Sequence, residues 1–165
     1  MEIRYINSDD DKFLISHIYE ESWKFAYKDI IPQSYLDSIP TGRWVSSIDK
    51  DGMNNLVMLD NGKFIGTSCF CKSRFKDFAD FGEIVSIYFL PEYMGKDYGK
   101  QLLDYAVKEL SKLGYSDIFL WVLEENYRAR KFYEKCGFVA TDNYLDDNIG
   151  GKELREIQYR FHIDI

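Results

Sequence analysis

The chain has few of the side chains that most metal and redox sites use, with two histidines and three cysteines among 165 residues. The cysteines form no CxxC pair and no His/Cys cluster accompanies them, so we expect neither a metal site nor a redox pair. Cys69 and Cys71 instead fit small buried side chains on one face of a strand. The odd cysteine count argues against a disulfide framework, and so few histidines give no basis for a Ser–His–Asp triad.

Long apolar runs and an excess of positive charge are also absent. The apolar stretches span only a few residues and no charged-then-apolar leader opens the chain, so we expect no transmembrane helix, no signal peptide and a cytoplasmic location. The formal net charge of −7 disfavours nucleic-acid and membrane partners, which require clustered positive charge. The same acidity is compatible with a cationic substrate such as an amine, although it also serves solubility alone.

The composition supports a folded core. The chain is 45% hydrophobic and 17% aromatic, with 30% charged residues, which is typical of a globular protein rather than a disordered one. It contains no linker, repeat or low-complexity segment. The length and this uniformity favour one α/β domain over residues 1–165.

The N-terminal part of the chain alternates between strand and helix patterns. Residues 2–6 alternate as a strand does, and a helix capped by Ser8 or Asp9 follows. Pro32 suits the first turn of a second, short helix. A third helical piece is predicted near residues 42–48.

The remaining pattern predicts a sheet with one parallel connection. Asn61-Gly62 between two strand-like runs is a strong hairpin signal, because both residues tolerate positive φ. The strand, helix and strand from residues 82 to 122 imply a right-handed parallel crossover, and a short helix and two strands around Gly150-Gly151 follow. Ligands of such sheets bind beyond the carboxyl ends of the strands, so the glycine turn after residue 90 and the segment after Trp121 should meet.

The stretch FGEIVSIYFLPEYMGKDYGKQLL, residues 81–103, carries the strongest functional signal. A strand bearing one acidic residue, Glu83, leads through a turn with glycines into an amphipathic helix. A helix that begins at such a turn presents free N–H groups and the positive end of its dipole, which together bind phosphate. A phosphate site joined to a carboxylate indicates a phosphorylated cofactor and proton-removal chemistry.

Two nucleotide motifs are excluded by spacing. A P-loop needs four residues between its first glycine and Gly-Lys, but only three separate Gly95 from Gly99. Gln101 also stands where Ser or Thr would bind magnesium. A dinucleotide GxGxxG motif fails because the glycine spacing differs and the turn does not follow the first strand.

The same turn resembles the GCN5-related N-acetyltransferase family. MGKDYG, residues 94–99, falls on that family's Gln/Arg-x-x-Gly-x-Gly/Ala signature, from which Met94 and Asp97 depart. NYRARKFYEKCGF resembles the family's later Asn-x-x-Ala-x-x-Phe-Tyr-x-x-x-Gly-Phe element, and ESWKFAYKDIIPQSYLDSI is similar to its N-terminal helices. The resemblance spans nearly the whole chain and points to the small-amine and polyamine branch or the branch that acetylates protein N-termini. It implies a mixed, mostly antiparallel sheet with a parallel β-α-β core and flanking helices.

The resemblance also implies a cofactor and residue roles. Acetyl-CoA would be the acetyl donor, with Glu83 as general base and Tyr133 as the acid that protonates the departing thiolate. The backbone of Ile87 would polarise the acetyl carbonyl, and that of Phe89 would contact pantetheine. The positions that fall on the coenzyme A site are Ile87, Phe89, Met94, Gly95, Lys96, Asp97, Tyr98, Gly99, Lys100, Asn126 and Arg130.

Each side-chain role has a structural alternative. Glu83 could simply begin a strand or form an ion pair, Tyr133 could be an aromatic core residue, and Asn126 could cap a helix. The aromatic residues that fall where family members bind acceptors are equally typical of a helix core. They are Trp23, Phe25, Tyr27 and Tyr35.

The leading interpretation is direct acetyl transfer, in a ternary complex, to a primary amine of a small molecule or polyamine. One alternative is a protein N-terminus or lysine as acceptor. Another is an acyl-CoA-binding module with little turnover, suggested by Met94 and Asp97, although retention of Glu83 and Tyr133 argues against it. No metal is expected, and a homodimer is compatible with the family.

Overall fold

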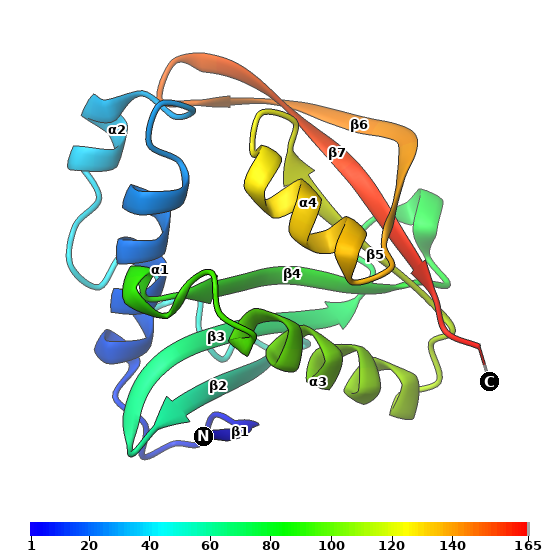
Figure 1. The fold of residues 1–165 in the computed structure, drawn as a ribbon, viewed down its shortest axis with the longest axis horizontal. Coiled ribbons are helices and arrows are strands. Elements are labelled where there is room, and N and C mark those ends of the chain that lie inside the picture. Colours follow the sequence, from blue (N-terminus) through cyan, green and yellow to red (C-terminus); the bar gives the residue numbers. More distant parts are fainter. Residues whose placement is uncertain (165) are drawn as a thin grey trace.

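The computed structural model describes residues 1–164, which form one seven-stranded sheet of order β1-β2-β3-β4-β5-β7-β6 (Figure 1). The strands are β1 (Glu2–Tyr5), β2 (Asn54–Asp60), β3 (Lys63–Lys72), β4 (Gly82–Phe89), β5 (Asp117–Leu123), β6 (Val139–Ile149) and β7 (Lys152–His162). The helices are α1 (Lys12–Ala26), α2 (Gln33–Asp37), α3 (Tyr98–Lys112) and α4 (Tyr127–Lys135), with 3-10 turns η1 (Lys76–Phe78) and η2 (Pro91–Tyr93).

The sheet confirms the predicted mixed α/β fold. β4 and β5 run parallel and are joined by α3, while the other neighbouring strands pair antiparallel. The predicted hairpin is present, with Asn61 at φ 49° and Gly62 at φ 85° between β2 and β3. Local turn chemistry therefore sets the register of this half of the sheet.

Helices cover both faces of the sheet. Leu102, Leu103, Ala106 and Leu110 of α3 are buried against one face, as the predicted apolar stripe requires. Leu113, the C-cap residue at the end of α3, is exposed. Residues 1–164 include no helix that is long and apolar enough to cross a membrane.

The predicted start of α1 is wrong by two or three residues. Asp11, rather than Ser8 or Asp9, is the N-cap, and its side chain accepts a hydrogen bond from the N–H of Phe13. A single sequence with several candidate caps in a row does not show which one the helix uses.

The third predicted helical piece is also wrong, because residues 41–49 form successive turns. Two N–H groups of this segment bond to buried side chains of α1 instead of to a helix ladder. The N–H of Gly42 donates to Glu20 at 2.9 Å, and that of Trp44 donates to the Ser16 hydroxyl at 3.1 Å. This anchoring places Trp44 against the aromatic face of α1, where its ring centre is 5.3 Å from that of Trp23.

Replacing the observed cap should destabilise the protein. We expect Asp11→Ala to lower the free energy of unfolding by about 1 kcal/mol, because it leaves an N–H group of the first turn without its partner. Asp9→Ala is the matched control and should change stability by less than about 0.5 kcal/mol, since the Asp9 side chain caps nothing. Urea unfolding of both variants measures the difference, and equal losses would contradict the assignment.

Candidate active site

A cavity opens where β4 and β5 separate. The two strands pair only over Gly82 and Glu83, opposite Ile118 and Phe119, and then diverge (Figure 1). The cavity has a volume of about 590 Å³, and its wall comes from α1, β4, the turn before α3, β5, α4 and β7. β3 bonds to only half of the backbone groups of β4, because an antiparallel partner reaches alternate residues. Past Glu83, the N–H and C=O groups of β4 that point toward β5 therefore have no strand partner in the described chain. A ligand in this gap can therefore bond to main-chain atoms.

The turn before α3 forms one end of the cavity. Gly95 has φ 74°, the left-handed region that favours glycine. Asp97 is the N-cap of α3 and makes no side-chain capping bond, so N–H groups of the first helical turn remain available. A Cβ at Gly99 would lie 3.2 Å from the Phe132 ring, so glycine lets α4 approach the start of α3. This geometry suits an anionic group.

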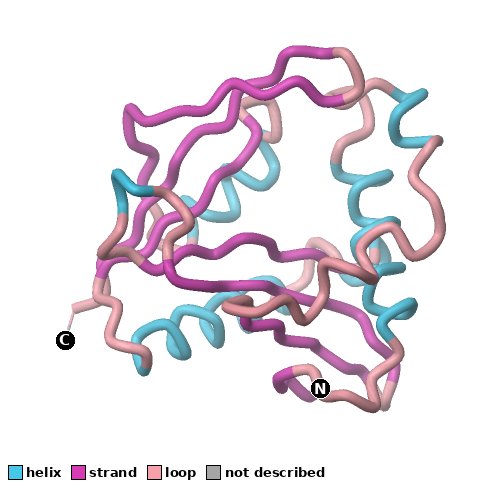
Figure 2. Tube along the Cα trace, turned by 180° about the vertical axis from the view of Figure 1, so that it is seen from behind, coloured by secondary structure: helices cyan, strands magenta, loops and turns pink. Residues whose placement is uncertain are grey.

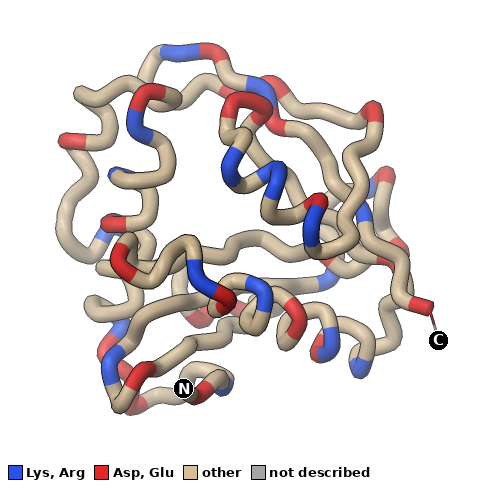
Figure 3. The backbone as a smooth tube through the Cα atoms, viewed as in Figure 1, with Lys and Arg blue, Asp and Glu red and all other residues tan. Residues whose placement is uncertain are grey.

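Lys and Arg positions are frequent along α4 and near the start of α3 (Figure 3). Those that line the cavity are Lys96, Arg128, Lys131 and Lys135. The Arg128 guanidinium reaches over the turn, since its Nη2 lies 3.4 Å from where a Cβ of Gly95 would be. Within residues 1–164, no hydrogen bond or ion pair occupies this guanidinium, so it can bind an anion there.

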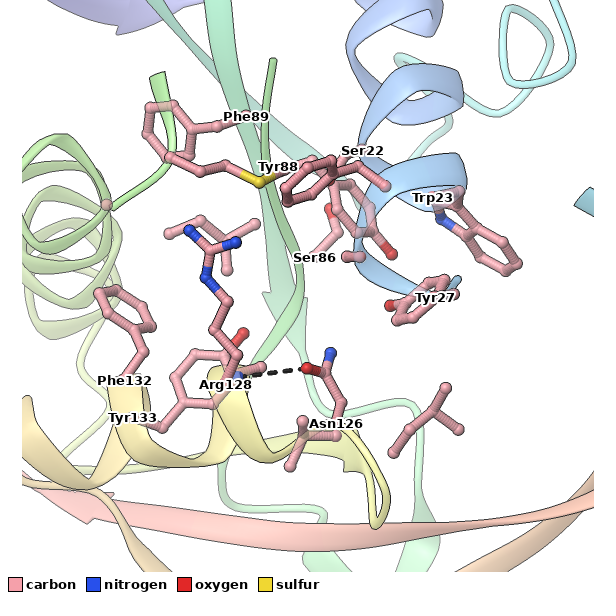
Figure 4. Close-up of a pocket in the computed structure, with 18 of the residues that line it drawn as sticks. Ser22, Trp23, Tyr27, Ser86, Tyr88, Phe89, Asn126, Arg128, Phe132 and Tyr133 are labelled. Atoms are coloured by element: carbon pink, nitrogen blue, oxygen red, sulfur yellow. Dashed lines mark hydrogen bonds between the residues drawn. The ribbon is translucent and has the colours of Figure 1, made fainter. Parts of the chain in front are cut away.

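The middle of the cavity carries a tyrosine and an asparagine from α4 (Figure 4). The Asn126 amide oxygen accepts a hydrogen bond from the N–H of Ala129 at 3.2 Å, so Asn126 both caps α4 and lines the cavity. Tyr133 lies beside Phe132, with ring centres 5.3 Å apart. Burial raises the pKa of Tyr133, which keeps its hydroxyl protonated at neutral pH.

The opposite end is aromatic (Figure 4). Trp23 and Tyr27 of α1 meet edge to face, with ring centres 4.9 Å apart and planes at 88°. Tyr88 of β4 lines the same end, and burial raises the pKa of both Tyr27 and Tyr88. Such a group of rings can hold the apolar part of a ligand and the face of a cation.

One carboxylate also lines this end, that of Glu156 on β7. It stands opposite Leu123 in the pairing of β5 with β7. Burial raises the pKa of Glu156, the negative charge of Asp147 raises it further, and Arg74 opposes this. No side chain in residues 1–164 donates a hydrogen bond to it.

Comparison with known proteins identifies the family. The model of the acetyltransferase (GNAT) family matches residues 14–138 of the chain. The chain belongs to the GNAT acetyltransferase family. The predicted N-acetyltransferase identity and the predicted fold are therefore confirmed.

Relatives of this GNAT protein differ in their acceptors. It is 30% identical over 162 residues to a spermidine N(1)-acetyltransferase of Thermoplasma acidophilum, covering 93% of this chain and 97% of that one. It is 34% identical over 102 residues to the [ribosomal protein bS18]-alanine N-acetyltransferase of Haemophilus influenzae, covering 60% of this chain and 66% of the relative. The comparisons therefore identify the family but not the acceptor.

Solved structures share the fold. The PaiA N-acetyltransferase of Thermoplasma acidophilum, in complex with coenzyme A, superposes with a TM-score of 0.75 at 24% identity, covering 98% of this chain and 100% of that chain. The putative acetyltransferase yncA of Salmonella typhimurium, with acetyl-CoA, gives a TM-score of 0.75 at 21% identity, covering 99% and 94%. The sheet described above is therefore the GNAT sheet.

The structure brings most of the predicted site residues to one cavity. Those that line it are Trp23, Phe25, Tyr27, Ile87, Phe89, Met94, Gly95, Lys96, Gly99, Asn126 and Tyr133. They come from four separate stretches of the chain, which the sheet and α4 gather together. This convergence agrees with the site that the GNAT resemblance implies.

Glu83 lies apart from the cavity. Its carboxylate is buried and ion-paired with Arg74, whose Nη2 lies 2.6 Å from one oxygen while Nε lies 3.2 Å from the other. The loop that carries Arg74 leads into η1, which packs on β5 with Phe78 5.3 Å from Phe119 (Figure 2). Glu83 therefore forms the ion pair that is the structural alternative to its role as a base. The base role of Glu83 stays a prediction, and its carboxylate does not line the cavity.

Other predicted site residues have different partners. Arg130 donates to the Tyr159 hydroxyl at 3.0 Å and to the Glu124 carbonyl at 2.9 Å, so its guanidinium secures α4 instead of lining the cavity. Lys100 pairs with Asp104 at 2.6 Å. Tyr35 packs against Gly150, at the tip of the last hairpin. The side chains of Asp97 and Tyr98 also lie outside the cavity wall.

Sequence reasoning missed the cations of α4 and Glu156. Arg128, Lys131 and Lys135 follow an i, i+3, i+7 spacing that places them on one helix face, a signal that could have separated them from Arg130. Glu156 alternates along β7 with buried Leu154 and Gln158, and a charge on a buried strand face is itself a signal.

Proposed function

We propose that this GNAT protein transfers acetyl from acetyl-CoA to a primary amine of a small molecule or polyamine, by direct attack in a ternary complex in the cytoplasm. The observation that carries the proposal is the two-ended cavity. One end combines a helix N-terminus with cations, and the other combines aromatic rings with a carboxylate. A donor that carries phosphates and an acceptor that carries an ammonium fit these ends respectively.

The residues present fit coenzyme A. Its phosphates suit the turn at Gly95, where the N–H groups of α3 and the Arg128 guanidinium converge. The gap beside β4 offers backbone groups at Ile87 and Phe89 for the pantetheine arm and the acetyl carbonyl. When bound, acetyl-CoA supplies the activated thioester.

Tyr133 is proposed as the acid. It lies between the cationic and aromatic ends, and its phenol, which is protonated at neutral pH, can donate its proton to a departing thiolate. Solvent then restores the proton. Asn126, fixed as the cap of α4, is proposed to bond to the pantetheine arm with its free amide nitrogen.

The acceptor is proposed to be a small amine or polyamine. The aromatic and acidic end of the cavity supports this, as does the full-length similarity to a spermidine N(1)-acetyltransferase. The second candidate is a protein N-terminus, favoured by the 34% identity to the enzyme that acetylates an alanine of ribosomal protein bS18.

A thiol-release screen tests the function. The protein is incubated with acetyl-CoA and polyamines, aminoglycosides, amino acids or peptides with a free N-terminus, and free thiol is followed. We expect release with polyamines or other small amines. Release with peptides alone would support the second candidate, and coenzyme A binding without release across all amines would contradict an enzymatic role.

Removing the negative charge before α3 should tighten donor binding. We expect Asp97→Gly to lower the Kd for acetyl-CoA about two- to fivefold, because Asp97 brings a like charge to the phosphate end and makes no capping bond that would be lost. Asp97→Asn should act in the same direction, while Asp142→Asn, on the exposed edge strand β6, is the matched control. Calorimetry showing weaker binding in Asp97→Gly would contradict the charge effect.

A further inference from the structure

Glu156 is a carboxylate in the acceptor end of the cavity that the family motifs do not account for. It lies on β7, far in sequence from the other site residues, and the tertiary fold brings it to the cavity wall. It shares the cavity wall with Tyr27 of α1 and Tyr88 of β4, and burial together with the negative charge of Glu156 raises the pKa of both tyrosines. The Nε1 of Trp121, on the strand beside it, is buried and has no hydrogen-bond partner in residues 1–164.

No ion pair within residues 1–164 offsets the cost of burying this charge. The cationic group that acts on Glu156 is Arg74, and Arg74 is itself bound to Glu83. The titratable and charged groups whose charges act on Glu156, or that respond to its charge, are Tyr27 from α1, Tyr88 from β4, Asp147 from β6 and Arg74 from the loop after β3. A half-buried carboxylate with no ion pair in the described residues is stabilised either by a proton or by a cation that binds from outside.

We propose that Glu156 binds the ammonium of the acceptor amine and takes its proton, so that it acts as the base of the transfer. This inference rests on the proposed function, because it assigns the acceptor end of the same cavity. It also names the acceptor class as a primary amine that is cationic at neutral pH, with its carbon chain against Trp23 and Tyr27.

The step balances without a further reactant. One N–H bond of the ammonium breaks, its electron pair stays on nitrogen as the nucleophilic lone pair, and the proton bonds to a carboxylate oxygen of Glu156. The carboxyl then releases this proton to solvent. Burial favours this exchange, because it raises the pKa of Glu156 toward the working pH, where a base is most effective.

Glu83 acts on this base through Arg74. Both oxygens of Glu83 accept hydrogen bonds from the Arg74 guanidinium, which holds that cation at the N-terminal end of β4. An Arg74 released from Glu83 would be drawn to Glu156, where it would occupy the ammonium site and lower the pKa of the base. Glu83 is therefore a positioning residue for Arg74, and its replacement should impair catalysis indirectly.

The first experiment compares Glu156→Gln with Glu153→Gln, an exposed control on the same strand. With spermidine at pH 7.5, Glu156→Gln should lower kcat/KM about 10²-fold or more, with an unchanged Kd for acetyl-CoA. The wild-type rate should fall as pH drops through the raised pKa of Glu156. The pH–rate profile of Glu156→Gln should lack this fall, and its activity should instead rise steadily up to pH 10 as free amine forms in solution.

The second experiment tests the link through Arg74. Glu83→Gln should lower kcat/KM about tenfold, and the double variant Arg74→Gln/Glu83→Gln should return to within about threefold of wild type. Recovery supports Glu156 as the base, because the double variant lacks Glu83 altogether. A double variant as impaired as Glu83→Gln would show that Glu83 itself carries the proton and would overturn the proposal.

The controls separate this inference from the proposed function. If the wild type releases no thiol with any amine, the proposed function has failed. If the wild type is active and Glu156→Gln retains its kcat/KM within about threefold and its pH profile, only the role of Glu156 has failed. A Glu156→Gln variant that binds acetyl-CoA normally and loses turnover with cationic amines supports both.

Discussion

Tyr133→Phe is expected to lower kcat about 10²- to 10³-fold, while the Kd for acetyl-CoA changes by less than about twofold. The substitution removes one hydroxyl and keeps the ring, which packs between Phe132 and Phe138. A thiolate that departs without a proton leaves far less readily, so the loss should fall on turnover. Stopped assays of kcat together with calorimetry of acetyl-CoA binding measure the two effects separately.

Tyr127→Phe is the matched control, because Tyr127 lies on the same helix but is 64% exposed and outside the cavity. It should leave kcat and KM unchanged. If Tyr133→Phe retained the wild-type kcat, Tyr133 would be an aromatic core residue and another group would have to donate the proton. A wild-type unfolding midpoint in Tyr133→Phe would show that lost turnover does not come from lost folding.

Arg128→Ala is expected to raise the Kd for acetyl-CoA about 10- to 100-fold, with a smaller change in kcat. The guanidinium reaches over Gly95 at the start of α3 and lies 5.6 Å from the centre of the Phe25 ring, but no hydrogen bond or ion pair in the described chain occupies its N–H groups, so they can bind a phosphate group. Binding should also become less sensitive to salt, because one ion contact is lost. Calorimetry at several salt concentrations measures both effects.

Lys108→Ala is the control, since it removes an exposed cation of α3 that does not line the cavity. Comparing coenzyme A with 3′-dephospho-coenzyme A shows which phosphate Arg128 binds. Equal losses for both ligands indicate the pyrophosphate, while a loss confined to coenzyme A indicates the 3′-phosphate. A Kd for acetyl-CoA in Arg128→Ala within about twofold of the wild-type value would remove Arg128 from the site.

Local patterns predicted the elements well and their ends less well. The hairpin at Asn61-Gly62 follows from backbone preferences that these two residues set by themselves. The sequence does not reveal which residue caps α1, because several acidic and hydroxyl side chains precede the helix. One of them, Asp10, accepts hydrogen bonds from the Arg4 guanidinium of β1 instead. The segment 41–49 was misjudged because its N–H groups bond to Ser16 and Glu20 on a distant helix.

The cofactor end could be anticipated more fully than the acceptor end. The turn at Gly95 and Gly99 and the motif around Asn126 and Tyr133 are each short in sequence, so spacing alone reveals them. The acceptor end has no such motif, because Tyr27, Tyr88 and Glu156 come from three distant elements. Which arginine of α4 faces the cavity also depended on packing, since Arg130 is held by Tyr159 of β7.

By itself, the sequence determined the family, the α/β sheet with its parallel β4–β5 pair, and the phosphate-binding turn, because all three follow from the local spacing of residues and from hydrophobic periodicity. Only the tertiary structure decided which partner each charged side chain has. It paired Glu83 with Arg74 and placed Glu156 in the cavity wall without an ion-pair partner among residues 1–164. The physical reason is that ion pairing and burial depend on distances between residues far apart in the chain, and those distances exist only once the sheet has formed.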